Sequence, residues 1–416
     1  MISALGVDFG TTNSVVAMLA EDGNVTTQRH GSLDVFRSVL CFWAEETPAR
    51  RMLHHAAGQA AIGDFLEDPL DSRLIMSMKT YLAQRSFSET RIFGHRFTLE
   101  GLIGCFLRSL LANLPPVRSV VVGRPVRFAG EFTDDALGSE RLRGAYAEAG
   151  VPEINLVLEP QAAGTRFART LTEPATVLIG DFGGGTSDFS VMHFDPRGQA
   201  TPLGHAGVGI AGDAFDYRII DRAIAPLLGK GDSYRVMGKL LPVPPQYFSS
   251  FSRWHMLSLM RTPRTLRAIA EVAHTAEHPE RLRHLIALIE DGLGYALYQA
   301  VSAAKAELSR AEAATLRFHH KKFVVERVIT RVEFEDWIAA DLTRIAGTVD
   351  QVLADANIPA DQVDRVFLTG GTAFVPAVRR LFERRFGADK LAGGGEFVSV
   401  AEGLALLGAD TKRPTL

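Results

Sequence analysis

The sequence predicts an α/β protein built from two lobes, and two observations support this prediction. Residues 5–18 (LGVDFGTTNSVVAM) and 178–192 (LIGDFGGGTSDFSVM) look like two copies of one sequence motif. Strand and helix signals also alternate along most of the chain. In each copy a short apolar run ends in aspartate, a Gly/Thr turn follows, and β-rich sequence resumes, which predicts a hairpin. Asp8 and Asp181 stand 173 residues apart (181 minus 8), a separation on the scale of a domain.

The two turns are chemically suited to phosphate. Glycine allows positive φ and close backbone approach, so that consecutive N–H groups converge on phosphate oxygens, and it occurs at Gly10, Gly183, Gly184 and Gly185. Hydroxyl or amide donors accompany these glycines at Thr11, Thr12, Asn13 and Thr186. A single Gly/Thr turn after aspartate also makes ordinary tight hairpins. The repetition favours a phosphate site.

The aspartates Asp8 and Asp181 add a requirement for a cation. A carboxylate beside a polyphosphate is repelled unless a cation lies between them, and Mg²⁺ usually keeps much of its water shell. We therefore expect both aspartates to hold Mg²⁺ through water, and a Mg·nucleotide to bind between the two lobes.

The remaining elements of the first half follow in order along the chain. Strands are expected at 35–43, 117–123 and 154–158, and a helix over about 131–149. The strand at 154–158 leads into Glu159-Pro160 and a small-residue helix start, QAAGTRFART. Strand and helix alternate again over 175–221.

In the second half the composition and periodicity of the sequence change, and a further glycine turn occurs. From about 223 to 330 the chain is first Pro-rich and irregular, then helical in period over 264–314 and strand-like over 315–330, which we interpret as an inserted subdomain. A strand at 364–369 then leads through Gly370-Gly371-Thr372 into a helix over 375–386. This unit is a natural place for a phosphate or nucleoside to meet a helix N-terminus.

Composition bounds the class of protein. With 416 residues, 46% hydrophobic and 22% charged, the chain is an ordinary globular protein of two to three domains. Its net charge of −3 gives no general attraction to nucleic acid or to an anionic membrane. The N-terminus lacks a leader pattern and no apolar run is long enough for a membrane helix, so a cytoplasmic protein is expected. Cys41 and Cys105 fit small core residues rather than a disulfide framework or zinc site.

Seven motifs follow one another in the order of a known family: GVDFGTTNS, EPQAAG, DFGGGTSDFS, GDAFDYRI, AKAELS, TRVEFEDWIAADL and FLTGGTAFVP. They resemble the nucleotide-binding domain of the seventy-kilodalton heat-shock chaperones of DnaK type, from Leu5 to about Gly408. GRPVRFAG, RSVLCFW and SMKTYL look closest to the short YegD-like members. The resemblance implies an actin-like ATPase fold, related to ribonuclease H, with Mg²⁺ and ATP or ADP in a cleft between two lobes.

The resemblance also implies a domain plan. Lobe I would comprise 1–174 with the first phosphate loop, and lobe II 175–392 with the second, including the inserted subdomain at about 213–330. Residues 393–416 would return to lobe I. Chaperones of this type continue into a peptide-binding domain and a lid, and the expectation here is that this chain lacks both.

Site roles follow motif by motif. Asp8 with the first turn, and Asp181 with Thr186 and the second, resemble the family's two phosphate loops, and Asp181 and Thr186 are expected to act in catalysis. Glu159 resembles the carboxylate that orders metal-bound and attacking water; from its own sequence it is equally a helix-entry Glu-Pro. Lys79 in SMKTYL resembles the lysine that neutralises charge on the transferred phosphoryl group. Further nucleotide contacts are expected at Gly212, Asp213, Lys305, Ser309, Gly370, Gly371, Thr372 and Phe374.

The adenosine-binding motifs depart from the family pattern. Ser302, Lys305, Ala306 and Ser309 stand where the family has an acid, a lysine and an arginine framing a serine. Phe374 replaces an arginine, and stacking of this ring on a base is one compensation. Ala211 replaces the first glycine of the turn before GDAFD. Phosphate and metal chemistry are therefore expected to be retained, with weaker adenine specificity.

We interpret the chain as a stand-alone, chaperone-related ATPase that switches conformation with nucleotide state and is read by an unknown protein partner. A nucleotide-sensing pseudoenzyme, a filament-forming actin relative, and a metabolite kinase with Asp188 or Asp213 as base are the alternatives. Residues 207–212 also spell G-x-G-x-x-G, but NAD binding is disfavoured because the stretch is expected to follow a polar loop rather than open a βαβ unit.

Overall fold

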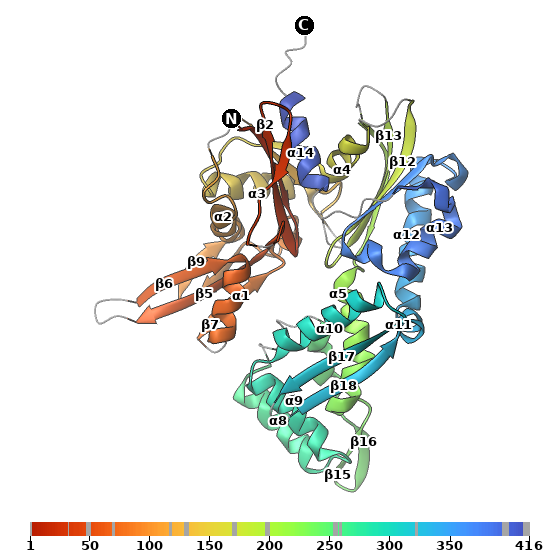
Figure 1. Cartoon of the computed structure of the whole chain (residues 1–416). Coiled ribbons are helices and arrows are strands. Elements are labelled where there is room, and N and C mark those ends of the chain that lie inside the picture. The colour runs from red at the N-terminus through yellow and green to blue at the C-terminus, as the bar shows by residue number, and fades with distance from the viewer. Residues whose placement is uncertain are drawn as a thin grey trace. The chain divides into compact units, whose positions relative to one another are not determined.

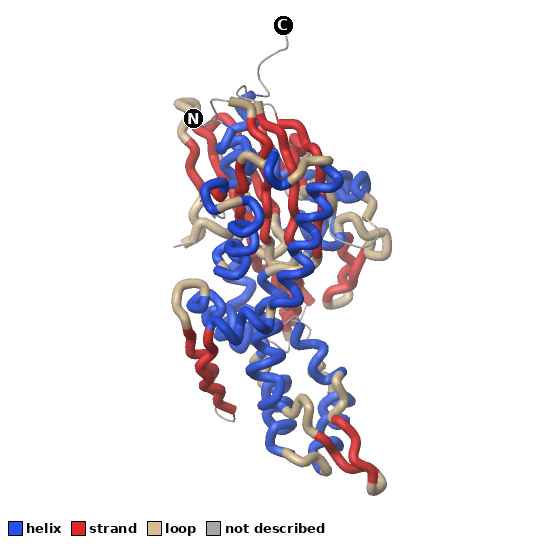
Figure 2. Tube along the Cα trace, turned by 90° about the vertical axis from the view of Figure 1, so that its right-hand side faces the viewer, coloured by secondary structure: helices blue, strands red, loops and turns tan. Residues whose placement is uncertain are grey.

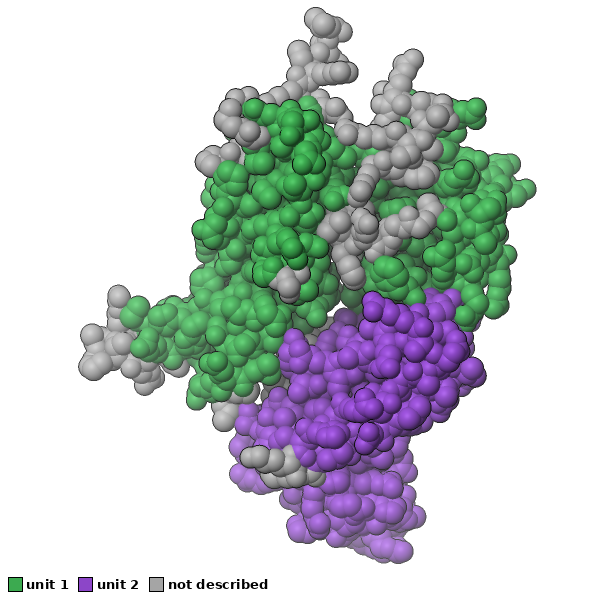
Figure 3. Space-filling view, viewed as in Figure 1, with its two compact units in different colours: residues 1–209, 345–374, 378–416 green, residues 210–344, 375–377 purple. Residues whose placement is uncertain are grey.

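The computed structural model describes residues 2–31, 33–46, 51–68, 71–115, 119–128, 133–168, 173–195, 200–252, 257, 260–320, 323–392 and 399–410. They divide into two compact units (Figures 1 and 3). Unit 1 comprises 1–209, 345–374 and 378–416, and unit 2 comprises 210–344 and 375–377. The division differs from the predicted lobes, which stay a prediction.

Unit 1 contains a first large sheet with the order β11-β10-β1-β2-β3. Strands β1 (Ile2–Phe9), β2 (Asn13–Ala20) and β3 (Val25–Thr27) form an antiparallel meander, and the short β4 (Phe36–Arg37) also pairs with β2. On the other side, β10 (Ser119–Arg124) runs parallel to β1, and β11 (Asn155–Leu158) parallel to β10. The Asp8 hairpin is thus at the centre of this sheet.

A second sheet of unit 1 repeats this topology in the order β14-β13-β12-β19-β20. Strands β12 (Ala175–Phe182), β13 (Ser187–Phe194) and β14 (Ala200–Val208) form the meander, and β19 (Arg365–Thr369) and β20 (Leu391–Ala392) add in parallel. From Ala4 to the tip, the hairpin register is identical after a shift of 173 residues: Phe9 faces Ser14 in β1–β2, and Phe182 faces Ser187 in β12–β13. The repeated sequence device is therefore a repeated structural unit.

Two helices, α4 (Glu159–Ala168) and α14 (Ser399–Asp410), lie between the two sheets (Figure 1). They share one core with both, since Val121 of β10, Ala162 of α4, Val177 of β12 and Leu404 of α14 belong to the same buried cluster. Glycine makes the close packing possible, because a Cβ on Gly403 would lie 1.8 Å from the carbonyl oxygen of Ala162. These contacts hold the helix that begins with Glu159 against both sheets.

The opposite face of the first sheet is covered by α2 (Leu99–Leu110) and α3 (Asp135–Glu148). Alternation along β1 produces the two-sided burial: Leu5, Val7 and Phe9 join the cluster that contains α2 and α3, whereas Ala4 packs with α14. Between the β4 strand and α2, the chain forms a three-stranded sheet of order β6-β5-β7, one helix, one turn and one hairpin. In chain order these elements are β5 (Val39–Glu46), β6 (Arg51–Ala57), α1 (Gly58–Glu67), β7 (Ser72–Met76), η1 (Met78–Tyr81), β8 (Glu89–Ile92) and β9 (His95–Thr98).

Helix α12 (Ala339–Ala356) precedes β19 in the chain, and helix α13 (Pro376–Phe386) comes after it. The second sheet packs closely on them: a Cβ on Gly204 of β14 would lie 2.7 Å from the carbonyl oxygen of Val352, and Phe382 of α13 contacts the rings of Phe182 and Phe189. The second sheet is therefore also covered by helices.

Unit 2 is mainly helical and carries two hairpins. Its helices include α5 (Gly212–Ile219), α6 (Gln246–Ser249), α8 (Pro263–His274), α9 (Pro279–Glu290), α10 (Gly294–Leu308) and α11 (Arg331–Trp337), with the turns η2 (Ile220–Ile224), η3 (Ala225–Leu228) and η4 (Ser250–Ser252). The hairpin β17 (Ala313–His320) and β18 (Phe323–Thr330) packs against α10 and α11. The hairpin β15 (Ser233–Val236) and β16 (Lys239–Pro242) extends from the helices of this unit (Figure 2).

The α/β class with mixed sheets agrees with the prediction, and three details differ. Seven elements between residues 51 and 110, from β6 to α2, had no sequence prediction apart from the isolated motifs there. The stretch taken as irregular after residue 223 contains the β15–β16 hairpin. The G-x-G-x-x-G stretch begins in the last two residues of β14 rather than after a polar loop, and because β14 is antiparallel to β13 it does not open a βαβ unit.

Among the described residues, no helix combines the length and apolar character that a membrane crossing requires.

Candidate functional site

The two predicted phosphate turns are four-residue hairpin tips in unit 1. Residues 10–13 lie between the paired residues Phe9 and Ser14, and residues 183–186 lie between the paired residues Phe182 and Ser187. In the second tip the N–H of Gly183 donates to the carbonyl of Thr186 at 2.9 Å. None of the four tip glycines has φ in the left-handed region, so that expected reason for glycine is wrong. Close approach is the reason at Gly10, where a Cβ would lie 2.0 Å from the carbonyl oxygen of Asn13.

The first tip is braced from one side. Thr11, Thr12 and Asn13 are half-buried, the carbonyl of Thr12 accepts from the N–H of Ser38 at 2.9 Å, and Arg37 donates to the side-chain oxygen of Asn13 at 3.1 Å. The side chain of Asn13 is therefore engaged by Arg37. No pattern in the sequence indicated Arg37, because it lies on the separate strand β4 that pairs with β2.

The structure brings Asp8, Asp181, Glu159 and Lys79 together in unit 1, as their mutual electrostatic effects show. Lys79 lies in the turn η1 and donates from Nζ to Oε1 of Glu159 at 2.7 Å, with both side chains 11% exposed. Glu159 begins α4, and the absence of a side chain at Gly123 leaves it room, because a Cβ there would lie 2.9 Å from Cγ of Glu159.

Asp188 joins this group and was considered in the sequence only as a kinase base. It stands directly opposite Asp181 in the β12–β13 register, so both side chains point to the same face of the sheet. The corresponding residue in the first hairpin is Val15, opposite Asp8. The hairpin pattern contains enough information to find Asp188, because register alone places it beside Asp181.

The three aspartates of this group, Asp8, Asp181 and Asp188, have raised pKa values. Burial raises the pKa of Asp8 to about 7, with the charge of Glu159 adding to the rise and Lys79 opposing it. Burial likewise raises the pKa of Asp181 well above its usual range and that of Asp188 to about 6, although a hydrogen bond from Thr186 works against the latter. Burial disfavours the charge of Lys79, but Glu159 and Asp8 outweigh it and raise its pKa.

Tyr146 of α3 is a further buried group beside Asp8. Its ring is fully buried, its hydroxyl has no hydrogen-bond partner among the described residues, and burial and then the charge of Asp8 raise its pKa. No sequence motif indicated it, since it reads as one aromatic of an ordinary helix.

The donor set fits a divalent cation. Four carboxylates, Asp8, Glu159, Asp181 and Asp188, face a single ammonium, and oxygen is the ligand that Mg²⁺ prefers. Within the part of the chain that the structure describes, no three His, Cys, Asp or Glu side chains are arranged to hold a metal directly. The contact of Mg²⁺ with Asp8 and Asp181 through water stays a prediction.

The third glycine turn lies beside the second tip. Thr369 pairs with Asp181 in the parallel β12–β19 register, and Gly370 has φ 89°, with its missing Cβ position 2.0 Å from the carbonyl oxygen of Phe182. A side chain is thus excluded at Gly370 on both counts. Thr372 is buried, whereas Phe374 is 55% exposed and its ring is open to a ligand.

Unit 2 holds the other four predicted nucleotide-binding residues, and its own side chains engage them. Lys305 of α10 lies 2.9 Å from Oδ1 of the buried Asp216 and donates to the carbonyl of Gly212 at 3.1 Å. Asp213 accepts from the hydroxyl of Tyr298 at 3.2 Å. Ser309 donates to the carbonyl of Lys305 at 3.3 Å. Their contact with nucleotide stays a prediction.

The raised carboxyl pKa values predict that the metal-free protein loses stability as the pH rises. Asp8 has a pKa of about 7 in the fold and about 3.9 in the unfolded chain, so between those values the folded state binds more protons. The free energy of unfolding therefore falls as the pH rises from about 4 to 7. Thermal unfolding in EDTA at pH 5 and pH 7.5 measures this, and Asp8→Asn is expected to raise the Tm at pH 7.5 by several degrees.

The matched control is Asp361→Asn, because Asp361 is exposed. Its Tm should follow the wild type at both pH values. A wild-type Tm in EDTA that is higher at pH 7.5 than at pH 5, or an Asp8→Asn variant no more stable than the control, contradicts the prediction.

Sequence comparisons relate this chain to known proteins. Residues 290–411 match the family model described as Hsp70 protein. Over 399 residues the chain is 24% identical to the chaperone protein DnaK of each of two strains of Thermus thermophilus, and the match covers 94% of this chain and 58% of each relative. The chain thus spans less than two-thirds of the length of these relatives. These matches support the resemblance to the Hsp70-type ATPase family, to which this chain is similar over most of its length, and the YegD-like subtype stays a prediction.

Proposed function

We propose that this chain binds Mg·ATP at the two hairpin tips of unit 1 and hydrolyses it slowly, and that ATP and ADP favour different conformations that a protein partner reads. The observation that carries the proposal is the repeated hairpin: two tips in the same register, each preceded by a half-buried aspartate, Asp8 or Asp181. The similarity to Hsp70-type ATPases supports it.

Each group has a role in this proposal. The backbone N–H groups and hydroxyls of the two tips bind phosphate oxygens, and Asp8 and Asp181 hold Mg²⁺ through water. Bound there, the cation neutralises phosphate charge. Lys79 places its ammonium beside the transferred phosphoryl group, and Glu159, which already accepts from Lys79, orders the attacking water.

The test of hydrolysis is phosphate release under single-turnover conditions with excess enzyme, Mg²⁺ and limiting ATP. Steady conversion to ADP and phosphate above the rate without enzyme is the expected result. Calorimetric binding of Mg·ATP without phosphate release would replace the hydrolase with a nucleotide-sensing pseudoenzyme.

A metabolite kinase remains a second candidate on one observation. Asp188 lies in the carboxylate group and its pKa of about 6 suits a base near neutral pH. Asp213 lies in unit 2 with Tyr298 as its partner. ATP consumption that depends on an added alcohol and produces a phosphorylated product, without free phosphate, would favour the kinase.

The nucleoside end predicts poor discrimination between bases. Ser302 and Ala306 stand where the resemblance places a charged frame around the base, while Phe374, 55% exposed, offers a ring that stacks on any base. We expect Mg·ATP and Mg·GTP affinities within about tenfold. Phe374→Ala should weaken both by about 1–3 kcal/mol, and Phe374→Tyr should retain them. Titration calorimetry measures all three proteins, and tight binding confined to ATP would contradict the prediction.

A further inference from the structure

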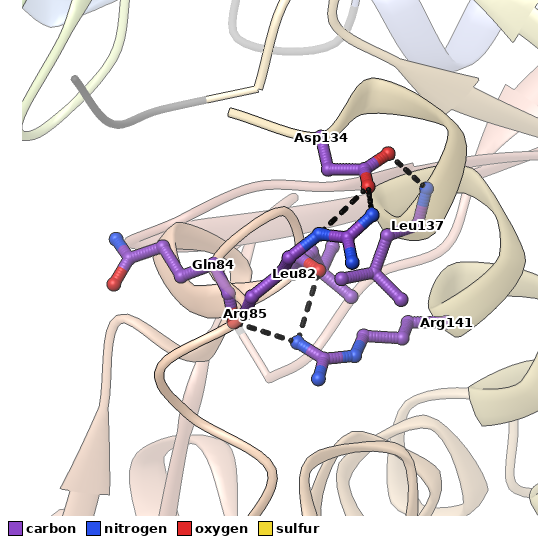
Figure 4. A network of polar contacts seen from close by, with 6 residues as sticks. All are labelled: Leu82, Gln84, Arg85, Asp134, Leu137 and Arg141. Atoms are coloured by element: carbon purple, nitrogen blue, oxygen red, sulfur yellow. Dashed lines mark hydrogen bonds and ion pairs between the residues drawn. The ribbon is translucent and has the colours of Figure 1, made fainter. Parts of the chain in front are cut away.

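One arginine of α3, Arg141, holds the backbone that follows Lys79. Its Nη1 donates to three carbonyls of this loop, those of Tyr81 at 3.3 Å, Leu82 at 3.2 Å and Gln84 at 3.0 Å. Its Nε lies 3.4 Å from Oε1 of Glu100 on α2, and its side chain is only 10% exposed. Figure 4 shows the guanidinium directed at the carbonyls of Leu82 and Gln84. The arginine therefore joins α2, α3 and this loop.

A second contact from α3 holds the same loop. Asp134 caps the helix by accepting from the N–H of Leu137 at 3.0 Å, and its own N–H donates to the carbonyl of Ala83 at 3.1 Å. Its carboxylate also accepts from Arg85 (Figure 4). Arg85 is 82% exposed, so its ion pair contributes little on its own. Buried Arg141 is the stronger constraint.

The clamped loop is directly bonded to the turn that carries Lys79. The N–H of Leu82, whose carbonyl Arg141 holds, donates to the carbonyl of Lys79 at 3.2 Å. The turn is entered through Ser77 at φ 55°, a left-handed conformation that costs a non-glycine residue about 1 kcal/mol or more. Such a turn keeps its shape only where its surroundings fix it. The Nζ at its apex meets Glu159 at 2.7 Å.

We propose that Arg141 is a positioning residue for Lys79: by fixing the loop 81–84 it holds the Lys79 ammonium against Glu159, in the place where the phosphoryl group is transferred. The proposal rests on the proposed function for its catalytic part. Arg141 itself is given no contact with the nucleotide. Its effect on turnover must then pass through Lys79, since a displacement of about 1 Å at a catalytic group lowers a rate by as much as a hundredfold.

The first experiment measures the position of Lys79 without using turnover. Nucleotide-free protein is labelled with trace acetic anhydride, and the acylation rate of each lysine is read by mass spectrometry. In the wild type the buried, ion-paired Lys79 should react slowly. Arg141→Met, which removes all donors, should raise the rate at Lys79 about tenfold, and Arg141→Lys, which retains the charge, should fall between. Arg108→Met is the control, because Arg108 of α2 donates to a carbonyl of α3 at Glu148.

The second experiment compares turnover in a double-mutant cycle. Arg141→Met should lower the ATP turnover number between about tenfold and a hundredfold while the Kd for Mg·ATP changes less than about threefold. In the Lys79→Ala background the same change should alter turnover less than about twofold, because the group it positions is gone.

An unchanged acylation rate at Lys79 in both Arg141 variants overturns the proposal, whatever the turnover. A turnover effect that persists fully in the Lys79→Ala background also overturns it. The acylation rate at Lys79 could rise in the Arg141 variants while the wild type never hydrolyses ATP. That result would remove the hydrolase function and leave Arg141 as the residue that positions Lys79. If Arg141→Met does not fold, Arg141→Lys carries both tests.

Discussion

Replacing Lys79 by alanine is expected to lower ATP turnover about a hundredfold and to leave nucleotide affinity nearly unchanged. The Lys79 ammonium is buried, hydrogen-bonded to Glu159 and surrounded by carboxylates that keep it charged. In such a site one electrostatic contact to the transition state contributes on the order of 3 kcal/mol. Phosphate release gives the rate and calorimetry gives the Kd. A loss of rate without loss of affinity marks an interaction made mainly in the transition state.

The control for this variant is Lys230→Ala in unit 2, where Lys230 forms an ion pair with Asp221. Its turnover should match the wild type. If Lys79→Ala hydrolyses ATP as fast as the wild type, the assignment of Lys79 is wrong. If the wild type and Lys79→Ala both hydrolyse ATP only at the background rate, the protein is a nucleotide sensor.

Removal of Mg²⁺ is expected to abolish most nucleotide affinity, and Asp8→Asn should weaken Mg·ATP binding between about tenfold and a hundredfold. Asp8 lies in a group of carboxylates that repels a polyphosphate unless a cation intervenes. A hydrogen bond to a charged group contributes about 1.5–3 kcal/mol, which sets the size of the effect. Titration of ATP with Mg²⁺ and with excess EDTA measures it.

Asp8→Asn also separates binding from folding. Because burial disfavours the Asp8 carboxylate, the variant should be at least as stable as the wild type without metal at pH 7.5. Asp361→Asn is again the control and should bind Mg·ATP normally. Equal ATP affinity with and without EDTA would refute the metal site, and a less stable Asp8→Asn protein would show that Asp8 is structural.

Local patterns in the sequence predicted the hairpins well. The runs before Asp8 and Asp181 are apolar on both faces, as strands covered by helices on each side should be, and the turn residues mark where each strand ends. The strand–glycine–helix unit at Gly370 was predicted for the same reason, because a strand pattern, a glycine turn and a helix pattern follow one another directly in the sequence.

Other site features involve residues far apart in the chain. Arg37 reaches Asn13 from another strand, and Arg141 reaches the loop after Lys79 from a helix about 60 residues later. The sequence around an isolated arginine does not show its role, because an arginine exposed to solvent and an arginine that holds a distant loop can have the same neighbours in sequence. The same is true of Lys305, whose partner Asp216 lies on a different helix.

The sequence by itself determined the α/β class, the two hairpin tips and the candidates Asp8 and Asp181, because these depend on periodicity and turn residues. Glu159 and Lys79 became candidates because their short motifs resemble those of a known family. Only the tertiary structure decided that these four side chains meet in unit 1, that Asp188 joins them, and that Lys305 is paired with Asp216. The physical reason is that pKa values, ion pairs and close packing depend on distances between segments, and those distances are set when both sheets close around α4 and α14.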